Sequence, residues 1–174
     1  MPQEAPSAFA KAVVDAQFLT NAWICRRSKE NVEADSMNSQ KQVFKTILSE
    51  DIDWKPFAAF PPSARLAVLV GQPSESGPYT IRVKVPHGVK LMPHRHPEDR
   101  VYTVISGVFY IGLGVEFDAD KLEAYPPGAV IVLPGNTSHF HWAKSCEYVT
   151  QVTAIGPLGL EYIKSSDDPR NSSV

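Results

Sequence analysis

The 174-residue sequence contains only two cysteines, Cys25 and Cys146, which lie far apart and outside any Cys-x-x-Cys motif. This scarcity argues against a disulfide framework and favours reduced thiols. The sequence also has no apolar run approaching the roughly 18 residues that a membrane span needs. Its formal net charge is only −2, so it lacks the basic surface that nucleic acids require. We therefore expect a cytoplasmic protein with neither membrane nor nucleic acid as a partner.

Turn-forming residues, by contrast, are plentiful: the chain has 15 prolines and 10 glycines. Between them lie short segments rich in β-branched and aromatic residues. Residues 79–85 alternate apolar and polar side chains, as a half-buried antiparallel strand does. Residues 43–48 predict a first strand, and residues 101–105 and 108–112, joined by Ser106-Gly107, predict a hairpin. Short strands and frequent turns predict an all-β sandwich or small barrel.

The first 42 residues have a different composition. Residues 7–23 carry apolar side chains at the spacing of one amphipathic helix, and residues 31–42 are polar. We expect an N-terminal extension over residues 1–42, partly helical or disordered, then a barrel over residues 43–165 and a flexible tail over residues 166–174. A docked helix and a poorly ordered extension both remain open.

Four of the five histidines form two His-x-His pairs, His94 with His96 and His139 with His141. Side chains at positions i and i+2 of a strand leave the same face, so each pair places two imidazoles side by side. Imidazole nitrogens are good ligands for transition metals. A single pair is also compatible with solvent exposure or core hydrogen bonding, but two pairs predict a shared metal site.

Two motifs around these histidines resemble those of the cupin superfamily, and the resemblance covers residues 52–165. The first comprises Gly88, His94-Arg95-His96, Arg100 and Gly107, and the second comprises Gly128, Pro134-Gly135-Asn136 and His139. The resemblance implies an all-β, double-stranded β-helix (jelly-roll) barrel, here with a short N-terminal helical extension. It also implies a divalent metal in the barrel and, often, a homodimer.

One position departs from the cupin pattern: the carboxylate ligand expected after the second histidine is Arg100. A guanidinium stays protonated and has no lone pair to donate, so it cannot be a ligand. In one outcome, the metal is held by His94, His96 and His139, with Glu98 or His141 completing its coordination. Imidazole ligands suit a divalent transition metal, which we expect to be Fe, Mn, Ni, Cu or Zn.

In the other outcome, no metal binds, because a cation beside a dication is unfavourable, and Arg100 and the histidines form an anion pocket. The conflict disappears if Arg100 points out of the barrel and pairs with Glu98 or Asp99. The metal-bound outcome implies an oxygenase-type enzyme that acts on a small organic molecule. Dioxygenase chemistry is the first expectation, isomerase or lyase chemistry the second, and Arg100, His141 and Tyr102 are the candidate catalytic residues.

The metal-free outcome implies a non-catalytic sensor or small-molecule binding protein. A storage or interaction role is supported only by the fold, which does not determine function. In either outcome we expect a small-molecule partner and a homodimer.

Overall fold

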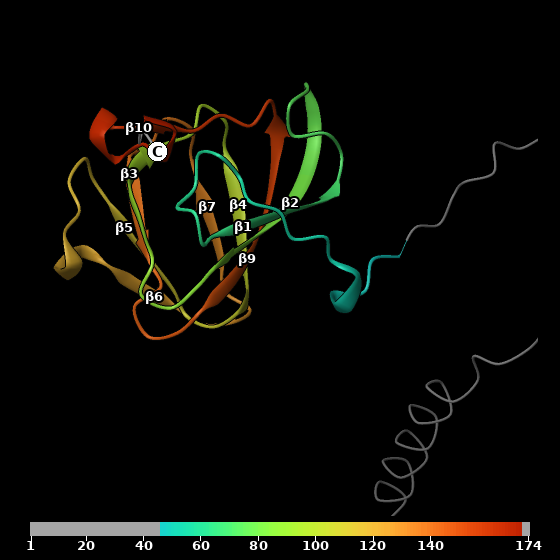
Figure 1. Cartoon of the computed structure of the whole chain (residues 1–174), viewed down its shortest axis with the longest axis horizontal. Helices are drawn as coiled ribbons and strands as arrows, with labels where there is room; N and C mark the ends of the chain where they lie inside the picture. The colour runs from blue at the N-terminus through green and yellow to red at the C-terminus, as the bar shows by residue number, and fades with distance from the viewer. Residues whose placement is uncertain (1–45, 172–174) are drawn as a thin grey trace, which may run out of the picture. The chain divides into compact units, whose positions relative to one another are not determined.

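The structure is a computed structural model that describes residues 46–171. The helix predicted over residues 7–23 therefore lies outside the described residues. Within them, the chain forms ten β-strands and four short 3-10 helices (Figure 1). The strands are β1 (Arg65–Val70), β2 (Gly77–Val85), β3 (Lys90–Arg95), β4 (Arg100–Ser106), β5 (Phe109–Leu113), β6 (Glu123–Tyr125), β7 (Val130–Leu133), β8 (His139–Trp142), β9 (Tyr148–Gly156) and β10 (Glu161–Tyr162). The 3-10 helices are η1 (Ser49–Asp51), η2 (Ala119–Lys121), η3 (Ser165–Asp167) and η4 (Pro169–Asn171).

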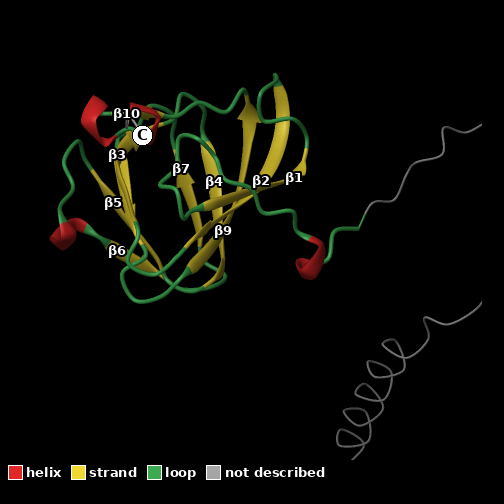
Figure 2. Ribbon diagram, in the orientation of Figure 1, coloured by secondary structure: helices red, strands yellow, loops and turns green. Residues whose placement is uncertain are grey.

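The strands form two five-stranded antiparallel sheets that face each other (Figure 2). Sheet A has the order β1-β2-β9-β4-β7, and sheet B has the order β10-β3-β8-β5-β6. Strands far apart in sequence are neighbours in both sheets, which is the arrangement of a jelly roll. The predicted all-β fold is confirmed. No helix in the described part of the chain is long and apolar enough to cross a membrane.

The alternation predicted for residues 79–85 is present in β2. Tyr79, Ile81, Val83 and Val85 are buried between the sheets, whereas the intervening polar side chains lie on the outer face of sheet A. β2 pairs with β9 without interruption from Gly77 opposite Gly156 to Val85 opposite Tyr148. This regular pairing fixes which side chains of β9 point into the barrel, because opposite residues share a face.

The hairpin predicted around Ser106-Gly107 is wrong. β4 lies in sheet A and β5 in sheet B, so the turn crosses from one sheet to the other. Tyr102 and Phe109 consequently stack across the core, with ring centroids 5.6 Å apart. Gly107 has a φ of 71°, and a Cβ there would lie 2.1 Å from the carbonyl oxygen of Glu147. Two strands that each bury one face give the same sequence pattern whether they pair or face each other.

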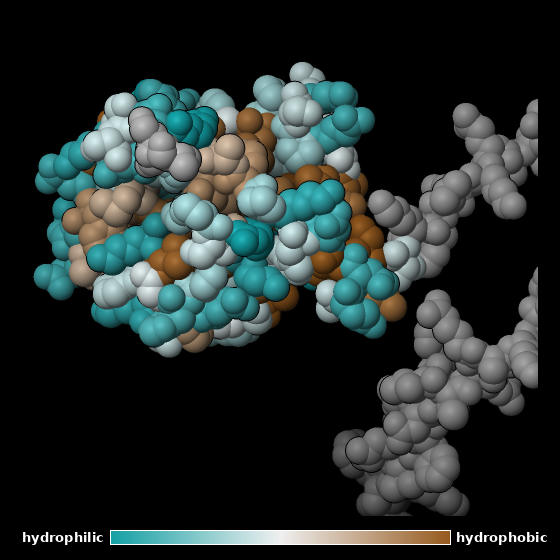
Figure 3. Space-filling view, in the orientation of Figure 1, coloured by the Kyte–Doolittle hydropathy of each residue, from teal (hydrophilic) through white to brown (hydrophobic). Residues whose placement is uncertain are grey.

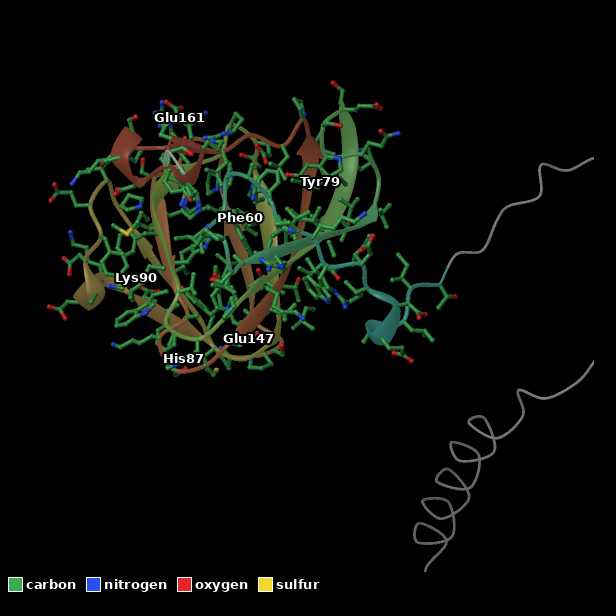
Figure 4. The ribbon with its side chains drawn as sticks, viewed as in Figure 1. Phe60, Tyr79, His87, Lys90, Glu147 and Glu161 are labelled. Carbon is green, nitrogen blue, oxygen red and sulfur yellow. The ribbon has the colours of Figure 1, made fainter. Side chains whose placement is uncertain are left out.

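The strand predicted over residues 43–48 is absent from residues 46–48, the described part of that segment. The chain instead forms η1 and then a segment that closes the barrel between the edge strands β1 and β10. Phe57 and Phe60 pack edge to face there, with ring centroids 5.0 Å apart, and Phe60 lies in the middle of the barrel in Figure 4. The Tyr162 hydroxyl donates a hydrogen bond to the Ala59 carbonyl at 2.9 Å. This contact joins the closing segment to Tyr162, which is the register partner of His94.

Candidate metal centre

Three of the four paired histidines converge inside the barrel. His94 on β3 and His139 on β8 are direct register partners, and His96 follows the end of β3. One ring nitrogen of each of the three lies within 4.8 Å of the corresponding atoms of the other two. The side chains are buried, with exposed fractions of 0%, 4% and 0% for His94, His96 and His139. The two strands therefore place three imidazoles around one point.

The hydrogen bonds of these histidines fix which nitrogen is free. His94 Nδ1 donates to the Met92 carbonyl at 2.7 Å, and His139 Nδ1 donates to the Thr137 carbonyl at 2.8 Å. His96 Nδ1 donates to the carbonyl of Gly159. Because a carbonyl only accepts, each Nδ1 carries the hydrogen and each Nε2 has a lone pair. Histidines that ligate a metal are usually held in this way.

The free nitrogens of two members of the triad have no partner within the described protein. The Nε2 atoms of His94 and His139 are buried and accept no hydrogen bond. Buried polar atoms without partners are rare and costly, so each one calls for an explanation. A metal ion bound by three Nε2 lone pairs would satisfy these atoms, and the residues present therefore fit such an ion.

Burial keeps the triad uncharged. It lowers the pKa of His139 to about 4, and it lowers the pKa of His94 well below its ordinary range, with repulsion from His139 as the next cause. The pKa of His96 is lowered first by burial and then by the Arg100 guanidinium. At neutral pH all three imidazoles are therefore in the form that binds metals.

Arg100 is buried inside the barrel and does not point out of it. Its Nε and Nη2 atoms donate to Glu98 Oε1 at 3.0 and 2.5 Å, and the exposed fractions of the two side chains are 3% and 8%. The Tyr79 hydroxyl donates to the same oxygen at 2.8 Å, and the Gly159 amide donates to Glu98 Oε2 at 3.2 Å. The positive charge beside the triad is therefore neutralised by an adjacent carboxylate.

Glu98 does not converge with the three histidines, as the predicted additional metal ligand would. Both of its oxygens are used by Arg100, Tyr79 and Gly159, and the group of converging ligand atoms does not include it. Asp99, the other predicted partner of Arg100, instead accepts a hydrogen bond from the Gly135 amide at 2.6 Å. The carboxylate nearest the triad thus serves as a counter-ion for Arg100.

A small inner cavity lies beside the triad. Its volume is about 10 Å³, room for roughly one water molecule, and Arg100, Tyr102 and His141 contribute to its wall. The Tyr102 hydroxyl and His141 Nε2 are buried without hydrogen-bond partners, as is the hydroxyl of Tyr148, another wall residue. Burial raises the pKa of both tyrosines and lowers that of His141. These three groups are therefore neutral and face a space of about one water molecule.

His141 lines this cavity and is not one of the converging ligands. Its ring centroid is 5.2 Å from that of His94 and 5.0 Å from that of His139, but it is not part of the converging group. Arg100, Tyr102 and His141, the candidate catalytic residues of the sequence analysis, thus line the cavity beside the triad. Tyr148, Tyr79 and Gly159 were not predicted. The only sequence signal for Tyr148 is its alternation with Thr150 and Val152, which is equally typical of a core strand.

A jelly-roll barrel with histidines from two motifs converging inside it is a cupin. More particularly, the chain belongs to the ChrR cupin-like family, because that domain matches residues 42–158, well over half of the chain. No curated protein matches the sequence.

Several solved structures share the fold at low sequence identity. The polyketide cyclase RemF from Streptomyces resistomycificus is 18% identical, with a TM-score of 0.59 over 74% of this chain and 91% of that one. A putative ethanolamine utilization protein Q from Salmonella typhimurium LT2 is 16% identical, with a TM-score of 0.54 over 68% and 90%. KdgF from Halomonas sp. is 20% identical, with a TM-score of 0.51 over 64% and 95%. These likenesses establish the fold alone.

Proposed function

We propose that this protein is a metal-dependent cupin that binds a divalent transition metal through His94, His96 and His139 and acts on a small organic molecule by oxygenase-type chemistry. One observation carries the proposal. Two buried Nε2 atoms of the triad have no partner, while all three Nδ1 atoms are held by backbone carbonyls. Such a set is costly for a protein that binds nothing there.

The ligand set limits the choice of ion. Neutral imidazoles favour Fe, Mn, Ni, Cu or Zn over Mg or Ca. When bound, such an ion supplies Lewis acidity and, in the case of Fe, Mn, Ni or Cu, the redox chemistry of oxygenases. Three neutral ligands leave its double positive charge intact, and Arg100 adds no net charge because Glu98 balances it. The ion itself therefore favours an anionic or chelating group on the part of a molecule that reaches it.

The cavity residues have roles that follow from their positions. Arg100 is a fixed cationic donor, and Tyr102 offers a buried hydroxyl with no other partner. His141 is held neutral by burial, which lowers its pKa, and its Nε2 atom is buried without a partner. The wall also includes the apolar side chains of Phe60, Val83, Leu91 and Val152. The small volume of the cavity does not accommodate an organic molecule as it stands.

A second candidate function is metal-free binding of a small anion, either as a sensor or as a carrier. The observation that favours it is the buried guanidinium of Arg100 in the wall of the inner cavity. The two functions differ in what stabilises the protein. A metalloprotein loses stability when a chelator removes its ion, whereas an anion-binding protein gains stability from inorganic anions and is unaffected by chelators.

Metal analysis tests the main proposal. Protein stripped with a chelator is incubated with each of the five metals, desalted and analysed by mass spectrometry for bound metal. We expect about one ion per chain, and loss of that ion in His94→Ala and in His139→Ala. His87→Ala is the matched control, because His87 is exposed and far from the triad. Figure 4 shows His87 at the opposite end of the barrel from Glu161. Glu161 marks the end where the triad lies, because it pairs with Arg95, the residue between His94 and His96. Metal at trace level in the unaltered protein would overturn the proposal.

We also propose a homodimer formed through the outer face of sheet A. A cross-strand row of β-branched residues runs over this face, and its members are Val70, Thr80, Thr153, Val101 and Val132. The exposed fractions of the three valines are 61%, 39% and 70%. Figure 3 shows hydrophobic groups exposed on the side of the barrel where β1 lies. Contiguous exposed apolar surface of this kind is typical of a protein interface.

A further inference from the structure

A second cavity lies outside the candidate metal centre. It is a groove of about 500 Å³ at the edge where both sheets end, with β7 on one side and β6 on the other. We call it the edge groove. Its apolar wall includes Ile111, Leu122, Ile131 and Leu133, and its floor extends to Thr137. Figure 2 shows η2, which supplies Asp120 and Lys121 to the rim, beside β6.

The edge groove is separated from the inner cavity by a single layer of side chains. Ile131 is the register partner of Tyr102, and Leu133 is the register partner of Arg100. In sheet B, Ile111 is the register partner of His141. Directly opposite residues of an antiparallel pair lie side by side on one face. Three wall residues of the groove are therefore immediate neighbours of the three polar residues beside the triad.

A fourth residue of the edge groove, Thr137, contacts the triad itself. Thr137 lines the edge groove, and its carbonyl accepts the hydrogen bond from His139 Nδ1 at 2.8 Å. A molecule that occupies the groove therefore touches the residue that orients one of the three ligands. The groove thus adjoins the metal centre from both sheets, although the two cavities share no lining residue.

The two cavities differ in the size of the molecule that each can hold. The inner cavity has room for about one water molecule, whereas grooves of roughly 300 to 1,000 Å³ are typical of sites for small organic ligands. An organic molecule of that size fits the edge groove and does not fit the inner cavity as it stands. From the groove, Ile111, Ile131 and Leu133 stand between such a molecule and Tyr102, Arg100 and His141.

The rim of the edge groove selects the polar end of the ligand. Asp120 and Glu123 contribute carboxylates, and Tyr125 donates to only one of the oxygens of Glu123, at 2.6 Å. Lys121, the cation of the rim, faces Asp118 at 3.6 Å and is partly neutralised by it. The balance of charge at the rim is negative, which complements a positively charged or hydrogen-bond-donating group.

From these relationships we infer that the edge groove is the binding site for the organic substrate of the metal centre, and that this substrate is a carbon-rich amine. Its apolar body lies against Ile111, Ile131 and Leu133, and its ammonium group lies at Asp120 and Glu123. The role as a substrate site rests on the proposed metal-dependent function. The binding of an apolar amine in the groove does not require the metal, so the two parts can be tested separately.

Calorimetric titration of the metal-loaded full chain with three matched probes tests the binding. The probes are 1-naphthylmethylamine, 1-naphthylmethanol and 1-naphthylacetate, which share a ring system and differ in charge. We expect the amine to bind about tenfold more tightly than the acetate, a difference of about 1.4 kcal/mol. The double variant Asp120→Asn, Glu123→Gln should bind the amine and the acetate equally.

A groove-filling variant locates the bound probe. Leu122→Trp places an indole in the groove and should weaken amine binding about tenfold or more. Val115→Trp is the matched control, because Val115 is exposed in the same loop and does not line the groove. It should leave the affinity unchanged. An amine that binds both variants with equal affinity would show that the probe lies elsewhere, and this outcome would overturn the inference.

Paramagnetic relaxation connects the groove to the metal. With Mn²⁺ bound, the proton resonances of the naphthyl ring should broaden strongly relative to the diamagnetic Zn²⁺ protein. If the amine fails to bind a protein that holds its metal, or binds without broadening, the groove assignment is overturned and the proposed function stands. If the amine binds the groove and the protein takes up no metal, the proposed function is overturned, and the role of the groove as a substrate site falls with it.

Discussion

Arg100 and Glu98 form a buried ion pair beside the histidine triad, with Nη2 of the guanidinium 2.5 Å from Oε1 of the carboxylate. The cupin pattern expects a carboxylate ligand at the position of Arg100. In this chain the carboxylate lies two residues earlier and binds a cation of the protein. The pair thus keeps a negative charge near the triad without using it as a ligand, which explains how a guanidinium can occupy this position.

Removing the negative member of this pair should be costly. Glu98→Gln leaves Arg100 buried without a counter-ion, and breaking a buried pair in this way costs about 3–5 kcal/mol. We expect a corresponding loss in the free energy of unfolding, measured with urea, and weaker metal binding because the free guanidinium repels the ion. The control is Glu161→Gln, which removes a salt bridge to Arg95 that is largely exposed. This change should cost at most about 1 kcal/mol. Equal losses in the two variants would contradict the predicted role of Glu98.

Gly159 links the triad to the ion pair. Its carbonyl accepts from His96 Nδ1, and its amide donates to Glu98 Oε2 at 3.2 Å. In Gly159→Ala the new Cβ would lie 2.6 Å from the ring of Pro97 and would displace this backbone. Because the groups that orient ligands typically contribute about 10- to 100-fold to metal affinity, we expect a loss of that size in a competition assay with a chromogenic chelator.

Gly88→Ala is the control for backbone strain, because it strains the chain without touching the groups that hold His96. Gly88 has a φ of 83°, so alanine is strained there, but its Cβ would meet nothing within 4 Å. We expect a loss of stability without a change in metal affinity. If both glycine variants bind the metal as tightly as the unaltered protein, the backbone of Gly159 does not position His96.

The triad could be predicted from the sequence because its geometry is mostly local. His94 and His96 are two residues apart at the end of a strand, and the spacing of the cupin motifs supplied the third ligand, His139. The inward direction of Arg100 could also be predicted from the sequence. Arg100, Tyr102 and Val104 alternate on β4 and are all buried, so the parity of that strand places Arg100 in the barrel.

Other features depend on contacts that the sequence does not encode locally. The hydrogen bond from His96 to Gly159 joins residues 63 positions apart. The turn at Gly107 has the same composition in a hairpin and in a crossover between sheets, so the pairing of β4 and β5 could not be deduced. The edge groove depends on which strands end both sheets, and that order follows only from the complete topology.

The buried histidines should make the metal-free protein sensitive to acid. Burial lowers the pKa of His139 to about 4, so between its ordinary value and pH 4 the unfolded chain binds a proton that the folded chain excludes. Stability is therefore unaffected above the ordinary pKa of histidine and falls as the pH drops below it, by about 1.4 kcal/mol per pH unit for each such group. The same direction holds for His94, His96 and His141.

Urea unfolding of the metal-free protein at pH 7.5, 6.5 and 5.5 measures this dependence. We expect the midpoint to fall over this range, and to fall less steeply in His141→Phe, which removes one buried titratable group. His87→Ala should have the slope of the unaltered protein, because His87 is exposed. A midpoint that does not change with pH would show that the imidazoles are protonated at little cost in the folded state.

The outer face of sheet A should hold two copies of the chain together. Val132 and Val101 are register partners in the exposed row of this face, so a charge at either position would be buried in the interface without a partner. We expect the unaltered protein to elute as a dimer in size-exclusion chromatography with light scattering, and Val132→Glu to elute as a monomer. Val115→Glu, which changes an exposed valine outside the strands of sheet A, should remain dimeric. A monomeric unaltered protein, or a Val132→Glu variant that stays dimeric, would exclude this face as the interface.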